Sequence, residues 1–177
     1  MNGSEVFPYF SKDGTRLLYT RKQRNTEDVF LINSDGTGDT PVSGGGGDQS
    51  RPIFASGKIV FFDSSRGEGI WDIASVASPG GSKTIEARGV RLPLRARPAI
   101  SPDGQWLAFS YDDPSKQNKI VIKHMQDGRT VDITTSFKAC GEPTWGVQNG
   151  RTLLGFTALP QSGSDWRFLT VQDVTDK

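Results

Sequence analysis

The sequence predicts an all-β protein built from four repeated units, and three observations support this prediction. Four prolines, Pro8, Pro52, Pro98 and Pro143, stand in similar surroundings, at spacings of 44, 46 and 45 residues. Each is followed by a turn that ends in glycine, as between antiparallel strands, because glycine tolerates a positive φ. The 21 Gly and 10 Pro residues of the 177-residue chain predict many turns, and no window combines a helical period with capping residues.

The first half of each unit predicts two short strands joined by the glycine turn. The first strand starts at the repeat proline. The second strand is rich in β-branched and aromatic residues, as strands are, and covers residues 16–20, 58–62, 105–110 and 151–156 in the four units.

The second half of each unit predicts a third strand at 28–33, 69–74, 119–123 and 165–171. A weaker fourth strand closes the first three units at 39–43, 83–86 and 130–134. Four strands in roughly 45 residues is the period of a β-propeller blade. We therefore expect one propeller domain over 1–177, with blades at about 5–43, 48–87, 94–135 and 140–177. A β-sandwich is the alternative, but a sandwich does not need four in-phase prolines and glycine turns.

The last unit ends at Lys177 without a clear fourth strand. Two explanations stay open. Residues Asn2–Val6 supply the missing strand by closing the ring, or the chain is an arc of a larger propeller, a fragment completed by other segments.

The third unit carries the most characteristic residues. Ser101-Pro-Asp-Gly104, after Pro98-Ala-Ile100 and before Trp106-Leu-Ala-Phe-Ser110, resembles the WD-like Pro-Asp-Gly repeat of TolB-like β-propellers. Phe10-Ser-Lys-Asp-Gly14 matches the same repeat, with Lys12 in place of proline. The second unit lacks the Pro-Asp pair, and the fourth has Gln148-Asn-Gly150 instead.

The resemblance implies a propeller fold, a bacterial envelope or periplasmic setting, and a protein or peptide partner. The family usually has six blades, whereas four are recognisable here. The same repeats also occur in propeller domains attached to serine peptidases, so the resemblance is specific for the fold and not for the function.

Composition excludes several function classes. The chain has 21 Lys and Arg against 20 Asp and Glu, and a net charge of +1 does not suit a protein that binds polyanions by bulk charge. No basic stripe runs across the units, so no nucleic-acid partner is expected. The apolar stretches are only a few residues long, which predicts no membrane insertion. The N-terminal residues do not form a signal peptide, so the compartment is open between the cytoplasm and the setting that the resemblance implies.

The catalytic residue types are scarce. One histidine, His124, rules out a multi-histidine metal centre within the chain, and one cysteine, Cys140, rules out an internal disulfide. We expect His124 at a strand end and Cys140 as a packing residue in a loop. Neither a nucleophile elbow nor a phosphate loop is present. The sequence therefore predicts a non-enzymatic protein without cofactor or metal. Four acidic residues fall in equivalent loops of the repeats: Asp63, Asp112, Asp113 and Asp165. We expect their side chains to be solvated. The alternative is that two of them form the paired carboxylates of a lyase or glycosidase.

The candidate binding residues lie where the innermost strands begin. The residue before each repeat proline is expected near the mouth of the central channel; these residues are Phe7, Arg51, Arg97 and Glu142. The segment 88–97 adds four arginines, whose planar forks suit an acidic peptide, a lipid head group or a partner loop. The alternative is a solvated connection whose arginines pair with nearby acids. The predicted binding set is Arg51, Arg91, Arg95, Arg97 and Glu142.

The functional hypothesis is a non-catalytic, protein-binding or scaffolding propeller of open oligomeric state. The alternative is the propeller part of a larger hydrolase, such as a serine peptidase, whose catalytic residues lie outside this chain.

Overall fold

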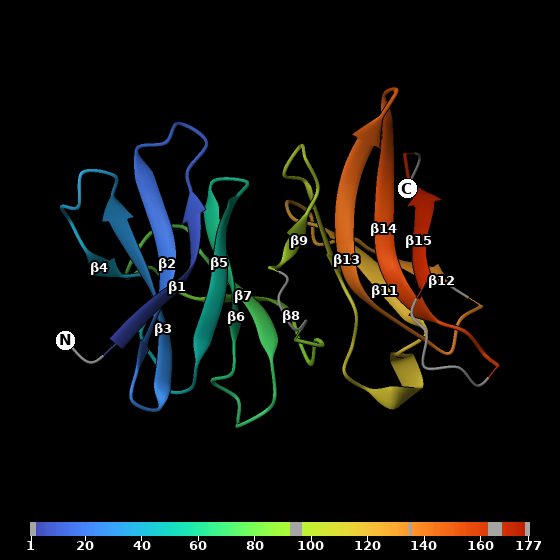
Figure 1. Ribbon diagram of the computed structural model, residues 1–177, viewed down its shortest axis with the longest axis horizontal. Coiled ribbons are helices and arrows are strands. Elements are labelled where there is room, and N and C mark those ends of the chain that lie inside the picture. The colour runs from blue at the N-terminus through green and yellow to red at the C-terminus, as the bar shows by residue number, and fades with distance from the viewer. Residues whose placement is uncertain (1–2, 93–96, 135, 163–167, 176–177) are drawn as a thin grey trace. The chain divides into compact units, whose positions relative to one another are not determined.

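The computed structural model describes residues 3–92, 97–134, 136–162 and 168–175 (Figure 1). The chain divides into two compact structural units, Met1–Arg88 and Gly89–Lys177, and from here on 'unit' means one of these two rather than one of the four sequence repeats. Each unit contains two antiparallel sheets, and in every sheet the strands follow one another in sequence order. The all-β propeller fold that the sequence predicts is confirmed at the level of these sheets.

The first unit holds two four-stranded sheets. The first sheet comprises β1 (Gly3–Phe10), β2 (Arg16–Gln23), β3 (Thr26–Asn33) and β4 (Thr40–Pro41). The second comprises β5 (Gln49–Ala55), β6 (Lys58–Asp63), β7 (Asp72–Val76) and β8 (Thr84–Ala87).

The second unit holds a four-stranded and a three-stranded sheet. The four-stranded sheet comprises β9 (Ala99–Ile100), β10 (Trp106–Phe109), β11 (Lys119–His124) and β12 (Thr130–Thr134). A short 3-10 helix, η1 (Pro114–Lys116), lies between β10 and β11. The last sheet comprises β13 (Ala139–Gln148), β14 (Arg151–Leu159) and β15 (Phe168–Asp173).

Of the two explanations for the last sequence repeat, completion by the N-terminal residues is not seen in the described residues. Gly3–Val6 belong to β1 and pair with Thr20–Gln23 of β2, while Asn2 lies outside the described residues. β1 continues through the position of Pro8 and starts five residues before the proline that marks the repeat. In the described part of the chain, β15 pairs on one side only, with β14.

The turn that follows β1 explains why serine and aspartate recur with glycine. Asp13 accepts hydrogen bonds from the Ser11 hydroxyl at 2.6 Å and from the backbone N–H of Thr15 at 3.0 Å. These bonds, with a further one from the Thr15 hydroxyl, lower the pKa of Asp13 from 3.8 to about 2. The third sequence repeat forms the same turn, since Asp103 accepts hydrogen bonds from the Ser101 hydroxyl and from the backbone N–H of Gln105. Each aspartate thus replaces backbone partners that the reversing chain lacks.

Sheets pack face to face within each unit. In the first unit, Leu18 and Val29 of the first sheet form one buried cluster with Phe61 and Ala74 of the second. In the second unit, Ile120 and Ile122 pack in a cluster with Leu154 and Phe156. Each sheet buries apolar side chains against its neighbour, so the two sheets of a unit cover one another's apolar sides.

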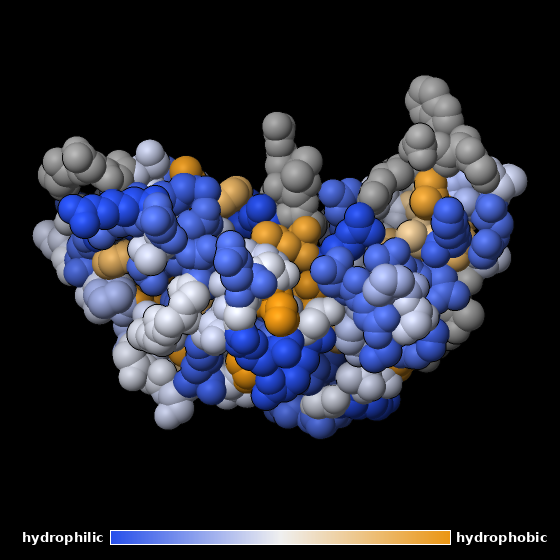
Figure 2. Space-filling view, turned by 90° about the horizontal axis from the view of Figure 1, so that it is seen from below, coloured by the Kyte–Doolittle hydropathy of each residue, from blue (hydrophilic) through white to orange (hydrophobic). Residues whose placement is uncertain are grey.

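Tyr9 and Phe10, which as aromatic residues of the first predicted strand are expected to fill the core between sheets, are exposed instead. Phe10 is 60% and Tyr9 is 36% exposed, because both stand at the end of β1, where the strand turns toward Ser11. Figure 2 shows a face that is mostly hydrophilic, with its hydrophobic residues in small groups. Among the described residues, no helix is long and apolar enough to cross a membrane.

The glycine-rich connection between the first two sheets is more closely held than its composition predicts. The sequence favours a flexible link at Ser43–Asp48. Gly47 adopts a φ of +86°, and a side chain there would meet the backbone of Ser64 and Ser65 at 2.7 Å. Asp48 is tied to the same place, because the N–H of Ser64 donates to its carbonyl at 2.8 Å.

Candidate functional site

A β-bulge lies within the first strand of three of the sheets, at the repeat proline. The pairing of β1, β5 and β13 with the next strand slips between Val6 and Tyr9, between Ser50 and Ile53, and between Gly141 and Thr144. The residue before the repeat proline has a left-handed backbone each time: φ is 54° at Phe7, 57° at Arg51 and 51° at Glu142. The repeat therefore reproduces one backbone geometry while the side chain that it carries changes.

This geometry is unfavourable for residues other than glycine. A non-glycine residue held in a sparsely populated backbone region costs about 1–3 kcal/mol and persists only where its surroundings enforce it. At Arg51, the surroundings include Thr20 of the neighbouring sheet, whose fully buried hydroxyl accepts the Arg51 N–H at 3.0 Å. The bulge thus directs a peptide N–H out of its own sheet and into the contact between sheets.

Arg51 and Phe7 come together in the first unit. The guanidinium carbon of Arg51 lies 5.1 Å from the centroid of the Phe7 ring, within cation–π range. Arg51 is only 9% exposed, and burial lowers its pKa while the charge of Glu27 raises it. Arginine remains charged at any physiological pH, so the first unit holds a largely buried cation against an aromatic face.

Arg97 and Glu142 come together in the second unit. They line one pocket of about 280 Å³, whose other walls are Pro98–Ile100 and Pro143–Trp145. The indole N–H of Trp145 donates to the carbonyl of Ala99 at 3.1 Å and so ties β13 to β9. The pocket therefore offers a cation, an anion and an aromatic wall at the place where two first strands meet.

Arg91 lies beside the same strand. Its N–H donates to the carbonyl of Ser110 at 2.8 Å, and its side chain lies against Gly141. A Cβ on Gly141 would be 3.9 Å from both Cδ and Nη1 of Arg91, an ordinary van der Waals distance, so the arginine stem lies close to the backbone of β13. Among the predicted binding residues, Arg97 and Glu142 thus share a pocket and Arg91 lies beside the neighbouring Gly141, whereas Arg95 lies outside the described residues.

The remaining candidate catalytic residues take part in packing, ion pairs or capping. His124 ends β11, as expected, with Nδ1 at 2.9 Å from a carboxylate oxygen of Asp127. Cys140 was expected in a loop, but β13 starts at Ala139, so Cys140 is a buried strand residue whose packing role agrees with the expectation. The acidic loop residues have other surroundings: Asp63 pairs with Lys83, Asp112 is exposed, Asp113 caps η1, and Asp165 lies outside the described residues. In the described residues, no cluster of three potential metal ligands occurs.

Gln49 is a buried polar residue that sequence reasoning missed. It is fully buried on β5, and neither of its amide atoms has a hydrogen-bond partner within the described residues. Register places it opposite Asp63, which in turn lies opposite Asp72, so three polar residues form a row across the second sheet. A glutamine three residues before a proline carries no signal from which this burial follows.

The comparisons place this geometry among known folds. No family model matches the sequence, and no curated protein matches it significantly. Solved structures do. Putative TolB from Agrobacterium tumefaciens matches all of this chain with 64% of its own length, at 16% identity and a TM-score of 0.67. TolB from Acinetobacter baumannii matches 89% of this chain with 41% of its own, at 19% identity and a TM-score of 0.55. A prolyl endopeptidase matches 97% of this chain with 27% of its own, at 14% identity and a TM-score of 0.64.

These likenesses define the chain as a protein of β-propeller fold. More narrowly, the fold is TolB-like, as the repeat residues indicated. The chain spans between about two fifths and two thirds of the length of the two TolB chains.

Proposed function

We propose that the chain is a non-catalytic recognition module that binds a protein or peptide through the side chains at the bulges of its first strands. The observation that carries this proposal is the shared left-handed backbone of Phe7, Arg51 and Glu142, three chemically different residues at one repeat position. Packing alone would favour glycine there, because glycine adopts this conformation without strain. The presence of side chains at these three positions, despite the strain of a left-handed backbone, favours a role for the side chains in recognition.

The pocket of Arg97 and Glu142 indicates the class of ligand. At about 280 Å³ it lies just below the usual range for small-molecule sites, and it suits one or two side chains of a larger partner. A cation beside an anion, with Trp145 as a wall, is complementary to a peptide that places opposite charges around an apolar residue. The resemblance to TolB-like propellers favours an extracytoplasmic setting for such a partner.

Selection from a random peptide library displayed on phage tests the proposal. On the immobilised chain we expect enriched peptides that combine an acidic and a basic residue with an apolar one. Synthetic versions should bind Arg97→Ser and Glu142→Gln at least about tenfold more weakly than the native chain, since each change removes a charged partner. Arg129→Ser is the matched control, because Arg129 is an exposed arginine that packs over Trp106 instead.

Three outcomes would refute the proposal. The library yields no common sequence, the selected peptides bind both variants with native affinity, or the purified chain cleaves peptides or polysaccharides with turnover that mass spectrometry detects. Unfolding temperatures of the variants, compared with the native chain, show whether lost binding reflects lost folding.

A second candidate is the propeller part of a larger hydrolase. The match of 97% of this chain to 27% of a prolyl endopeptidase favours it. Its test is the complete coding sequence: an adjoining α/β-hydrolase segment would support this candidate, and a coding sequence without any catalytic domain would refute it.

A further inference from the structure

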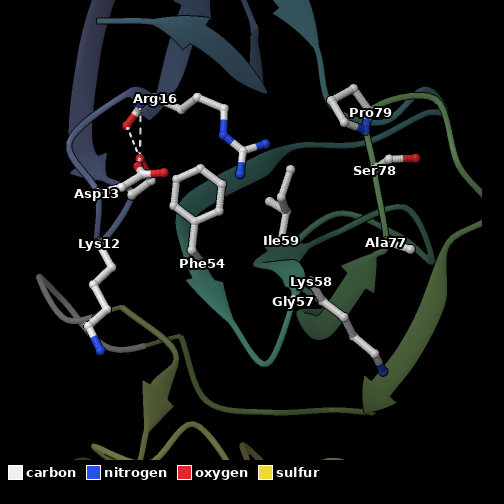
Figure 3. A pocket seen from close by; sticks show the side chains of 11 residues that line it. Lys12, Asp13, Arg16, Phe54, Gly57, Lys58, Ile59, Ala77, Ser78 and Pro79 are labelled. Atoms are coloured by element: carbon white, nitrogen blue, oxygen red, sulfur yellow. Dashed lines mark hydrogen bonds between the residues drawn. The ribbon is translucent and has the colours of Figure 1, made fainter.

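A second pocket lies within the first unit, at the ends of strands where the chain turns. It has a volume of about 430 Å³ and is built from three separate segments (Figure 3). The turn after β1 supplies Ser11–Asp13 and Arg16, the hairpin of β5 and β6 supplies Phe54 and Gly57–Ile59, and the segment after β7 supplies Ala77–Pro79.

One part of this pocket is apolar. Phe54 is half-buried and packs on the core cluster of the first unit, and Ile59 is a buried member of that cluster. Pro79 and Ala77 add carbon surface from the third segment (Figure 3). A ligand that covers this surface removes apolar area from water and is favoured for that reason.

Arg16 places a charge over the apolar part. Its guanidinium carbon lies 5.3 Å from the centroid of the Phe54 ring, and Figure 3 shows the group extending over Phe54 and Ile59. Within the described residues, the Arg16 side chain has no ion pair or hydrogen bond. Its backbone is fixed, because the N–H of Arg16 donates to the Ser11 hydroxyl at 2.9 Å. The Arg16 backbone is thus anchored, while the N–H donors of its guanidinium group are available to a ligand.

The other charged groups of the pocket have their own hydrogen-bond or ion-pair partners or point elsewhere, although the charge of Arg16 also helps to lower the pKa of Asp13. Asp13 is committed to Ser11 and Thr15, whose hydrogen bonds hold its pKa low. The ammonium of Lys58 pairs with Glu86 at 3.0 Å. Lys12 extends away from the guanidinium in Figure 3. With three basic residues and one acidic residue in its lining, the pocket is complementary to an anion.

We propose that this pocket binds a carboxylate attached to an apolar group, with the carboxylate on the Arg16 fork and the apolar group over Phe54 and Ile59. A guanidinium matches the two oxygens of a carboxylate in one plane. A bare phosphate or acetate would satisfy the arginine and leave the carbon surface exposed, so both halves of the ligand are required. A free small acid and the C-terminus of a peptide share this chemistry.

Three ligands separate the two requirements. We expect N-acetyl-L-phenylalanine to bind, N-acetyl-L-phenylalanine amide to bind at least about tenfold more weakly because it lacks the charge, and acetate to bind more weakly still. NMR titration of the native chain measures the three affinities. The shifts should fall on the signals of Phe54, Ile59 and Arg16.

Arginine substitution isolates the fork. In Arg16→Gln, the acid and the amide should bind with the same low affinity, whereas Arg16→Lys should retain part of the preference for the acid. Arg151→Gln is the matched control, because Arg151 also opens the second strand of its sheet and is exposed, yet it pairs with Asp173. That variant should bind like the native chain.

A peptide that ends in phenylalanine, with a free or an amidated C-terminus, distinguishes the two sources. Tighter binding of the free-ended peptide than of N-acetyl-L-phenylalanine would assign the pocket to a peptide terminus, and the reverse would assign it to a small acid. The proposal is overturned if the acid does not bind, if acid and amide bind the native chain equally, or if Arg16→Gln keeps the native preference.

Discussion

Replacing Phe61 with alanine is expected to lower the free energy of unfolding by about 3–5 kcal/mol. Phe61 lies in the middle of β6 and is fully buried, at 0% exposure. It contributes to the cluster between the two sheets of the first unit, where Leu18 comes from one sheet and Ala74 from the other. Its removal leaves a cavity that neither sheet can fill, because both are held by their own hydrogen bonds.

Urea unfolding, followed by tryptophan fluorescence, measures this loss. Phe10→Ala is the matched control: it deletes the same ring from a position that is 60% exposed, and it should change the free energy of unfolding by no more than about 0.5 kcal/mol. Equal effects of the two substitutions would contradict the face-to-face packing of these sheets.

Asp72→Ala is expected to cost about 2–3 kcal/mol, the second largest effect. The Asp72 side chain is 2% exposed and accepts two hydrogen bonds from Arg66, from Nε and Nη2, each at 2.5 Å. Breaking a buried pair usually costs about 3–5 kcal/mol, because the remaining charge is left without a partner. The Arg66 side chain is 37% exposed, so water compensates part of the loss and the expected value is smaller.

Asp132→Ala provides the comparison. Its carboxylate pairs with Lys119 at 2.9 Å, but the Asp132 side chain is 52% exposed, and an exposed pair contributes at most about 1 kcal/mol. The same urea titration should therefore separate the two aspartates clearly. A loss at Asp72 no larger than that at Asp132 would contradict the expected contribution of the buried Asp72–Arg66 pair.

Much of the fold follows from short-range signals in the sequence. The prolines and the Asp-Gly turns repeat with the period of the sheets, because each turn satisfies its own backbone through residues two or three positions away. The strand starts do not follow in the same way. β1 and β5 begin before their prolines, since a bulge allows the strand to continue past a residue that cannot donate a hydrogen bond.

The candidate sites likewise differ in how far the sequence predicts them. The position before each repeat proline is visible in the sequence, and the structure pairs Phe7 with Arg51 and brings Arg97 to Glu142. The shared channel mouth that was expected for all four residues stays a prediction. The pocket that Arg16 lines was not predicted from the sequence, because its walls come from three separate segments whose proximity depends on how two sheets pack. No pattern along the chain encodes that proximity.

Glu142→Gly gives the most direct test of the claim that the bulges present side chains for recognition. Glycine accepts a φ of 51° without strain, so the variant keeps the backbone of β13 and deletes only the side chain. Titration of a selected peptide into this variant should show a loss of affinity of at least about tenfold, with a free energy of unfolding that is unchanged or up to about 1 kcal/mol higher. Native affinity for the peptide in the folded variant would contradict the account.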